Sequence, residues 1–258
     1  MPIIAHFLRP HSITLFAYPF SVFILLATAL LCSKPAQAAS INAFDAVYNV
    51  HALGMTLGVS KHRFRCEQTQ CTLQAVSKPQ GLAKLLINEQ SEETIKLAQT
   101  QNTLRWLSYQ KKYGPDLSNP SSLKTQTFYL SDQLPNQVYN PKRQKSWPVQ
   151  PQLYDSISLA YAVQFNVLNK KPLNGFFLQD RKRQEAIKFI ASFYEVDLTL
   201  DNGQTYSKTP LFEFQSLEAD IKVWLLTEYD FFPARVDVYN RKQNKTVTLL
   251  LQEPPKML

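Results

Sequence analysis

The feature that most constrains the fold is an alternation of apolar and polar residues with period two. In YEVDLTL, residues 194–200, Val196, Leu198 and Leu200 fall on one face and polar residues on the other. This pattern is typical of a half-buried β-strand, whose side chains point alternately to opposite faces. Further candidate strands are residues 44–50, 56–66, 71–77, 86–98, 103–112, 186–200, 211–217, 220–226, 234–239 and 245–251. Their short links predict a mainly β fold, an antiparallel sheet that curls or forms an incomplete barrel.

Two stretches interrupt the strand pattern. Residues 114–151 are rich in proline, which removes backbone donors and disfavours regular pairing, so a linker, a lid and an ordered excursion all fit. Residues 154–168, YDSISLAYAVQFNVL, predict a helix with Asp155 or Ser156 as its cap. The apolar residues of this segment fall on all sides of the helix, so we expect it to be buried and packed on the concave face of the sheet.

The N-terminus indicates the compartment. Residues 13–31 form an apolar run that follows Arg9, and small residues precede a cleavage position after Ala38. This arrangement predicts a signal peptide over residues 1–38, although a retained transmembrane anchor is the alternative. We therefore expect an exported, periplasmic protein with a single β-rich domain over residues 39–258.

Two cysteines, Cys66 and Cys71, follow the predicted signal peptide in the stretch RCEQTQC. They could be half a zinc site, a redox pair or a structural disulfide. The flanking segments look like two strands joined by a four-residue loop, EQTQ, and cysteines facing each other across a hairpin lie within disulfide range. A C-x-x-C motif at a helix start and a second pair of zinc ligands are both lacking. In an oxidising compartment the sequence therefore predicts a Cys66–Cys71 disulfide and no metal.

Three segments carry a family resemblance: FDAVYNVHALGMTLG, YDSISLAYAVQF and FFPARVDVYNRKQNKTVTLLL. Together they resemble the bacterial exported proteins grouped as domain-of-unknown-function family 3108, over about residues 44–252. The resemblance implies a secreted or periplasmic β-rich domain of unassigned activity. It supplies no catalytic or ligand-binding residues.

Catalytic signatures are lacking in the sequence. His51 and His62 lie in strand-like segments without the spacing of a metal site, so we expect surface or half-buried strand residues. Acid pairs such as Glu92 with Glu93 could supply two carboxylates for glycoside hydrolysis, but chains of this size commonly contain such pairs. We predict no catalytic residues and no cofactor.

Basic residues gather in two runs, PKRQKSW at 141–147 and RKRQ at 181–184, the second at a predicted hairpin. Two of the 28 basic residues precede residue 39 and all 20 acidic residues follow it, so the exported part is modestly basic. The runs fit either solvated loops or a surface that attracts anionic lipid headgroups or cell-wall polymers. Export argues against nucleic acid as a partner. Arg181, Lys182 and Arg183 are the candidate ligand-binding residues.

Curled antiparallel sheets often enclose apolar ligands. The preferred hypothesis is therefore noncatalytic binding of an envelope lipid or glycan, with the basic loops at the mouth of the sheet. One alternative is a structural or partner-binding envelope protein whose concavity the helix fills. The other is an envelope hydrolase with an unrecognised site.

Overall fold

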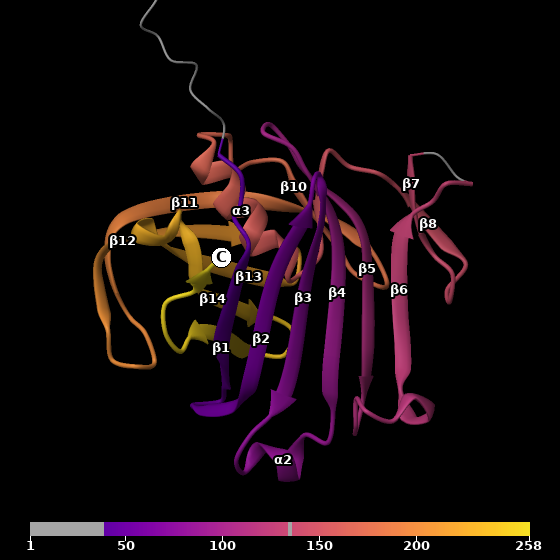
Figure 1. The fold of residues 1–258 in the computed structure, drawn as a ribbon, viewed down its shortest axis with the longest axis horizontal. Coiled ribbons are helices and arrows are strands. Elements are labelled where there is room, and N and C mark those ends of the chain that lie inside the picture. Colours follow the sequence, from indigo (N-terminus) through magenta and orange to yellow (C-terminus); the bar gives the residue numbers. More distant parts are fainter. Residues whose placement is uncertain (1–38, 134–135) are drawn as a thin grey trace, which may run out of the picture. The chain divides into compact units, whose positions relative to one another are not determined.

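A computed structural model describes residues 39–133 and 136–258 of the chain. Within these residues, sixteen strands form one open sheet (Figure 1). The strands are β1 Phe44–Ala52, β2 Met55–Glu67, β3 Gln70–Pro79, β4 Gln90–Gln99, β5 Leu104–Gly114, β6 Lys124–Leu130, β7 Gln137–Asn140, β8 Lys145–Pro148, β9 Gln152–Tyr154, β10 Phe176–Gln179, β11 Gln184–Thr199, β12 Thr205–Gln215, β13 Ala219–Leu226, β14 Phe232–Asn240, β15 Lys245–Leu251 and β16 Lys256–Met257. The helices are α2 Ala83–Leu86 and α3 Ser158–Leu168, with 3-10 turns at Pro120–Ser122 and Thr227–Tyr229. The predicted signal peptide lies outside the described residues.

The strand order runs β8-β7-β6-β5-β4-β3-β2-β1-β15-β14-β13-β12-β11-β10-β9, with β16 also paired to β1. The described strands pair antiparallel except β9 with β10, which confirms the predicted mainly antiparallel β fold. The β1–β15 pair joins the N-terminal and C-terminal series of strands. In Figure 1, strands β1 to β6 run up and down, whereas β11 to β14 run across behind them. The sheet therefore bends strongly without closing.

The alternation of side chains gives the sheet a core face. On this face Phe44, Phe64, Leu73 and Ile95 are buried, one from each of the neighbouring strands β1 to β4. Each such side chain contributes roughly 1.5–3 kcal/mol when removed from water. The residues between them point to the opposite side, here called the outer face. The sequence pattern thus fixes which residues build the core.

Several predicted elements differ from those in the structure. The strand expected from residue 86 begins at Gln90, because residues 83–86 form the short helix α2. The proline-rich stretch contains three strands, β6, β7 and β8, where we expected little regular pairing. Its described prolines lie between strands, except Pro148 at the end of the edge strand β8, where an interior ladder bond is not needed.

Helix α3 begins at Ser158, four residues later than predicted, and it is buried along most of its length. Asp155 Oδ1 accepts hydrogen bonds from the backbone N–H groups of Ile157 (2.8 Å) and Ser158 (3.0 Å), so this carboxylate caps the first turn as expected. On the helix, Tyr161 stacks on Phe44 of β1 at 5.2 Å between ring centroids. Packing of α3 on the concave face stays a prediction.

The predicted disulfide between Cys66 and Cys71 is present, with an S–S distance of 2.04 Å. The two residues are directly paired across β2 and β3, and their Cα atoms are 4.0 Å apart. The loop is shorter than the expected four residues, because Glu67 and Gln70 continue the ladder and leave Gln68 and Thr69 as the turn.

The disulfide should pin the β2–β3 hairpin without being needed for folding. In the chain-entropy model a loop this short gains only about 2 kcal/mol. We expect the Cys66→Ser/Cys71→Ser double variant to fold and to lose about that much unfolding free energy in urea titrations. Thiol labelling of denatured, unreduced protein should find neither Cys66 nor Cys71 free; two reactive thiols would contradict the assignment.

Candidate functional site

A buried hydroxyl and imidazole cluster lies where α3 meets the core face. His62 is only 4 % exposed, so the expectation of a surface or half-buried residue is wrong for this histidine. Its Nδ1 lies 2.8 Å from the Tyr161 hydroxyl and its Nε2 lies 3.0 Å from Ser60 Oγ. The Tyr161 hydroxyl also lies 3.3 Å from that of Tyr48, which donates to the Pro233 carbonyl. Hydroxyl partners on both ring nitrogens explain how the sequence can bury this residue.

This cluster is electrostatically neutral. Burial lowers the pKa of His62 to about 3, because a charged imidazolium is poorly solvated in the core. Burial likewise raises the pKa values of the Tyr48 and Tyr161 hydroxyls above their usual range. With both ring nitrogens engaged inside the core, His62 acts as a structural residue.

The buried carboxylates also have structural partners. Glu93 accepts a hydrogen bond from the Tyr109 hydroxyl at 2.6 Å and one from Lys111 Nζ at 3.1 Å. Asp155 accepts from Trp106 Nε1 at 3.0 Å in addition to capping α3. Glu92 follows the strand alternation to the outer face, where Gln74 donates to it. Because Glu92 and Glu93 point to opposite sides of β4, they do not form a pair of facing carboxylates.

The described residues contain no cluster of three or more histidine, cysteine, aspartate or glutamate side chains that could hold a metal ion. Within the same residues, no helix is long and apolar enough to cross a membrane.

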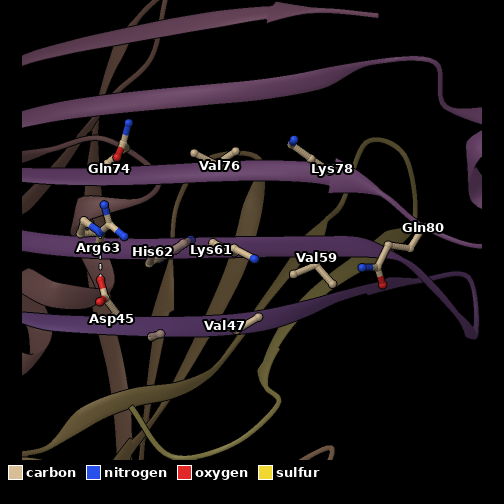
Figure 2. Close-up of a pocket in the computed structure, with 11 residues that line it drawn as sticks. Asp45, Val47, Val59, Lys61, His62, Arg63, Gln74, Val76, Lys78 and Gln80 are labelled. Carbon is tan, nitrogen blue, oxygen red and sulfur yellow. Dashed lines mark hydrogen bonds and ion pairs between the residues drawn. The ribbon is translucent and has the colours of Figure 1, made fainter. Parts of the chain in front are cut away.

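An outer groove of about 560 Å³ runs over strands β1, β2 and β3 (Figure 2). Sheet register places its outward side chains in successive rows across these strands, such as Val47, Lys61 and Val76. Its lining residues are Asp45, Ala46, Val47, Val59, Lys61, His62, Arg63, Gln74, Val76, Lys78 and Gln80. The volume lies within the range of about 300–1,000 Å³ that small-molecule sites occupy.

The groove combines an apolar floor with cations. Val59 is 6 % exposed and contributes to the floor, although it lies on the outer face. Arg63 is paired with Asp45 at 3.0 Å, whereas Lys61 and Lys78 form no ion pair within the described residues. Burial alone would raise the pKa of Asp45, but hydrogen bonds from Arg63 and Arg65 lower it. The groove therefore offers two ammonium groups without an ion-pair partner in the described part of the chain, beside valine side chains.

A second hollow lies between the start of α3 and strands β13 and β14. Its volume is about 150 Å³, well below that of typical ligand sites. Leu159 and Ala160 of the helix face Val223 and Val236 of the sheet there, and Arg183 lies at its polar side. This hollow is therefore too small for the apolar ligand that we expected.

The structure brings together the two basic runs, which are about 40 residues apart in the sequence. Asn140 Nδ2 donates to the Arg181 carbonyl at 3.3 Å, and Lys145 Nζ donates to the Lys182 carbonyl at 3.1 Å. We call the resulting surface the basic patch; its exposed cations are Lys142, Arg143, Lys145, Arg181 and Lys182. None of the five has an ion-pair partner in the described part of the chain.

Arg183, the third predicted ligand-binding residue, differs from its neighbours. It forms a 2.7 Å ion pair with Glu218 and lies within 4 Å of both Asp180 and Glu185. The Glu218 hydrogen bond is the main cause of the raised pKa of Arg183. Its charge is therefore compensated within the protein, and Arg181 and Lys182 are the free cations of the predicted triplet.

Comparison with solved structures identifies the fold. A β-barrel-like protein of the DUF1849 domain of unknown function from Brucella abortus is similar, with a TM-score of 0.52, 8 % identity, and coverage of 86 % of this chain and 100 % of that one. A Bacteroides fragilis protein described as exported, with a YmcC-like fold, gives a TM-score of 0.33 at 8 % identity over 85 % of this chain and 98 % of that one. The second similarity is too low to support an argument.

The sequence comparisons are negative. No protein-family model matches the chain, and no curated protein matches it. The predicted resemblance to family 3108 is therefore not confirmed. Similarity at 8 % identity establishes a β-barrel-like fold shared with a bacterial domain of unknown function, and nothing about ligands.

Buried, neutral His62 should make stability depend on pH. The pKa of His62 is about 6.5 in the unfolded chain and about 3 in the folded protein. The contribution of neutral His62 to the unfolding free energy is therefore fully present above pH 6.5 and is lost progressively as the pH falls toward 3. This residue alone should cost about 2 kcal/mol between pH 7 and pH 5. Urea unfolding should show that loss shrinking in His62→Gln but not in the matched variant His51→Gln. Equal pH dependence in both variants would contradict a neutral His62.

Proposed function

We propose that this protein is a noncatalytic binder of an anionic envelope lipid and that the lipid occupies the outer groove. The observation that carries this proposal is the combination, in one groove of about 560 Å³, of a valine floor with two unpaired lysines. An acyl chain would cover Val47, Val59 and Val76, and its anionic head would lie between Lys61 and Lys78. Apolar contact supplies affinity and the cations select an anionic head.

The Cys66–Cys71 disulfide supports an extracytoplasmic location, since such bonds persist in oxidising compartments. The predicted signal peptide would deliver the chain to the periplasm, where amphipathic anions are abundant. Structural partners hold Glu93 and Asp155, which favours binding over hydrolysis. A structural or partner-binding function becomes the preferred alternative if anionic lipids do not bind.

Removing the two free charges should weaken lipid binding. We expect Lys61→Gln/Lys78→Gln to bind dansyl-labelled undecanoate about tenfold more weakly in fluorescence titrations, because each exposed charge contact is worth up to about 1 kcal/mol. Val76→Asp should weaken it further by placing a carboxylate on the floor. Palmitate should displace the probe and methyl palmitate should not.

The matched control is Lys124→Gln/Lys188→Gln, which removes two exposed lysines outside the groove. This variant should bind like the parent protein. An equal loss of affinity in the control and groove variants would show that the loss depends on net charge and not on the groove. Unchanged affinity in both variants would show that the lipid does not bind in the outer groove.

The basic patch favours a second candidate function, retention of an anionic glycan. Its five exposed cations lie in two loops and at the start of β8. No apolar floor of groove size accompanies them among the described residues, which suits a flexible charged polymer better than an acyl chain. Polyelectrolyte attraction of this kind needs clustered charge and no enclosed cavity.

Neutralising Lys142, Arg143, Arg181 and Lys182 to glutamine should reduce retention on immobilised dextran sulfate, with neutral dextran as the blank. Arg183 stays intact because its ion pair with Glu218 is part of the fold. The difference from the parent should shrink with salt, since the Debye length is only about 8 Å at physiological ionic strength. The melting temperature should hardly change. If the patch variant were retained as strongly as the control variant Lys124→Gln/Lys188→Gln, the basic patch would not be the glycan-binding surface.

A further inference from the structure

We propose that the end of the sheet formed by the β1–β2 turn and the α2 segment docks onto a lipid bilayer and inserts apolar side chains into its interface. This apolar tip consists of Leu53, Met55, Leu82 and Leu85. In Figure 1 the β1–β2 turn and α2 lie at the same lower end of the sheet. The proposal is independent of the lipid groove, because membrane docking does not require a bound ligand.

The tip side chains face solvent to an unusual degree. Leu82 and Leu85 are 80 % and 83 % exposed, the largest values among the described large apolar residues. Leu53 and Met55 are 66 % and 48 % exposed. Leu53 and Met55 belong to the β1–β2 hairpin, whereas Leu82 and Leu85 belong to the connection between β3 and β4. Exposed apolar side chains accompanied by lysines suit insertion among lipid headgroups.

One of these leucines occupies a position where a polar residue would serve the local fold better. Leu53 and Gly54 form a two-residue hairpin turn with φ of 54° and 75°, a conformation that favours Asn-Gly and strains a leucine. An exposed leucine at this turn costs local stability and therefore indicates a use outside the folded chain. Leu82 directly precedes α2 with helical backbone angles, so its exposure and not a capping position distinguishes it.

The α2 segment is nevertheless firmly attached to the sheet. Gln80 N–H donates to the Leu57 carbonyl at 3.1 Å, and Ala83 is buried while its neighbours Leu82 and Leu85 point outward. At the end of β3, just before this segment, the close approach of β2 requires Gly58, because a Cβ there would lie 2.3 Å from the Lys78 carbonyl oxygen. The tip is therefore held in position by the fold.

The charges around the tip point to a bilayer with anionic lipids. Lys84 lies between Leu82 and Leu85 and is exposed. Val247 pairs with Ala52, so exposed Lys245 of β15 lies beside the Leu53 turn. Neither lysine has an ion-pair partner among the described residues. Glu89 is an exposed acid at the end of the same segment, and the two lysines beside the leucines can contact lipid phosphates.

The outer groove begins next to this tip. Lys78 and Gln80 line the groove and directly precede the α2 segment, and a hollow of about 150 Å³ under Ile87 shares Val59 and Lys78 with it. Docking of the tip would therefore place one end of the groove at the membrane surface.

Vesicle flotation tests the proposal with the variant Leu53→Asn/Leu82→Ser/Leu85→Ser. We expect the exported, purified protein to float with phosphatidylethanolamine–phosphatidylglycerol vesicles, and the variant to bind at least about tenfold more weakly. Its melting temperature should stay the same or rise, because asparagine suits the turn and the side chains of Leu82 and Leu85 are almost fully exposed. A stable variant with lost flotation separates membrane docking from a structural role.

The matched control is Ile190→Ser/Phe193→Ser/Leu258→Ser, which removes three exposed apolar side chains away from the tip. It should float like the parent. All these proteins share the same N-terminus, so residues 13–31 cannot account for a difference between them. Undiminished flotation of the tip variant would overturn the proposal, as would equal loss in the control. If the tip variant instead lost self-association, the tip would be a contact surface between two copies of the chain and not a membrane anchor.

The two proposals fail separately. Tip variants should still bind dansyl-labelled undecanoate in solution, because Lys61, Lys78 and the valine floor are unchanged. Lys61→Gln/Lys78→Gln should still float with vesicles, because the tip leucines remain. Loss of both properties in either variant would show that the groove and the tip are one site.

Discussion

The hydroxyl and ring of Tyr161 connect helix α3 to the sheet. The helix lies outside the strand ladder, so side-chain contacts and not ladder hydrogen bonds hold it against the strands. Tyr161 stacks on Phe44, meets Phe232 edge-on at 6.0 Å and hydrogen-bonds to His62. A barrel closes through its ladder, whereas this sheet keeps two free edges, β8 and β9, and its contacts with the helix include a buried polar cluster.

The hollow beside α3 is small, so the binding that we propose lies on the outer face. The hollow beside α3 holds about 150 Å³, whereas the outer groove holds about 560 Å³. The same strands serve both purposes because alternate residues point in opposite directions. On β2, His62 and Phe64 build the core while Lys61 and Arg63 line the groove. Changing the groove residues should therefore disturb the core little.

The sequence predicted elements whose cause is local. Period-two alternation located most of the long strands, and the Asp155 cap and the Cys66–Cys71 pairing followed from short-range patterns. The errors arose where tertiary context decided the outcome. Strands β6 to β8 form in a proline-rich stretch because the prolines fall between strands or at an edge. His62 is buried because Tyr161, 99 residues away in the sequence, supplies a hydroxyl.

The outer groove could not be predicted from one strand, because its floor depends on the register of three. Val47, Val59 and Val76 are far apart in the sequence and each interrupts an otherwise polar face. A valine on the polar face of a strand was the available signal, yet isolated exposed valines are common. Leu53 carried a stronger signal, since it stands in a two-residue hairpin turn whose chemistry favours asparagine before glycine. An apolar residue that violates a local rule at an exposed position is therefore a better starting point for proposing an intermolecular contact than one that satisfies the rule.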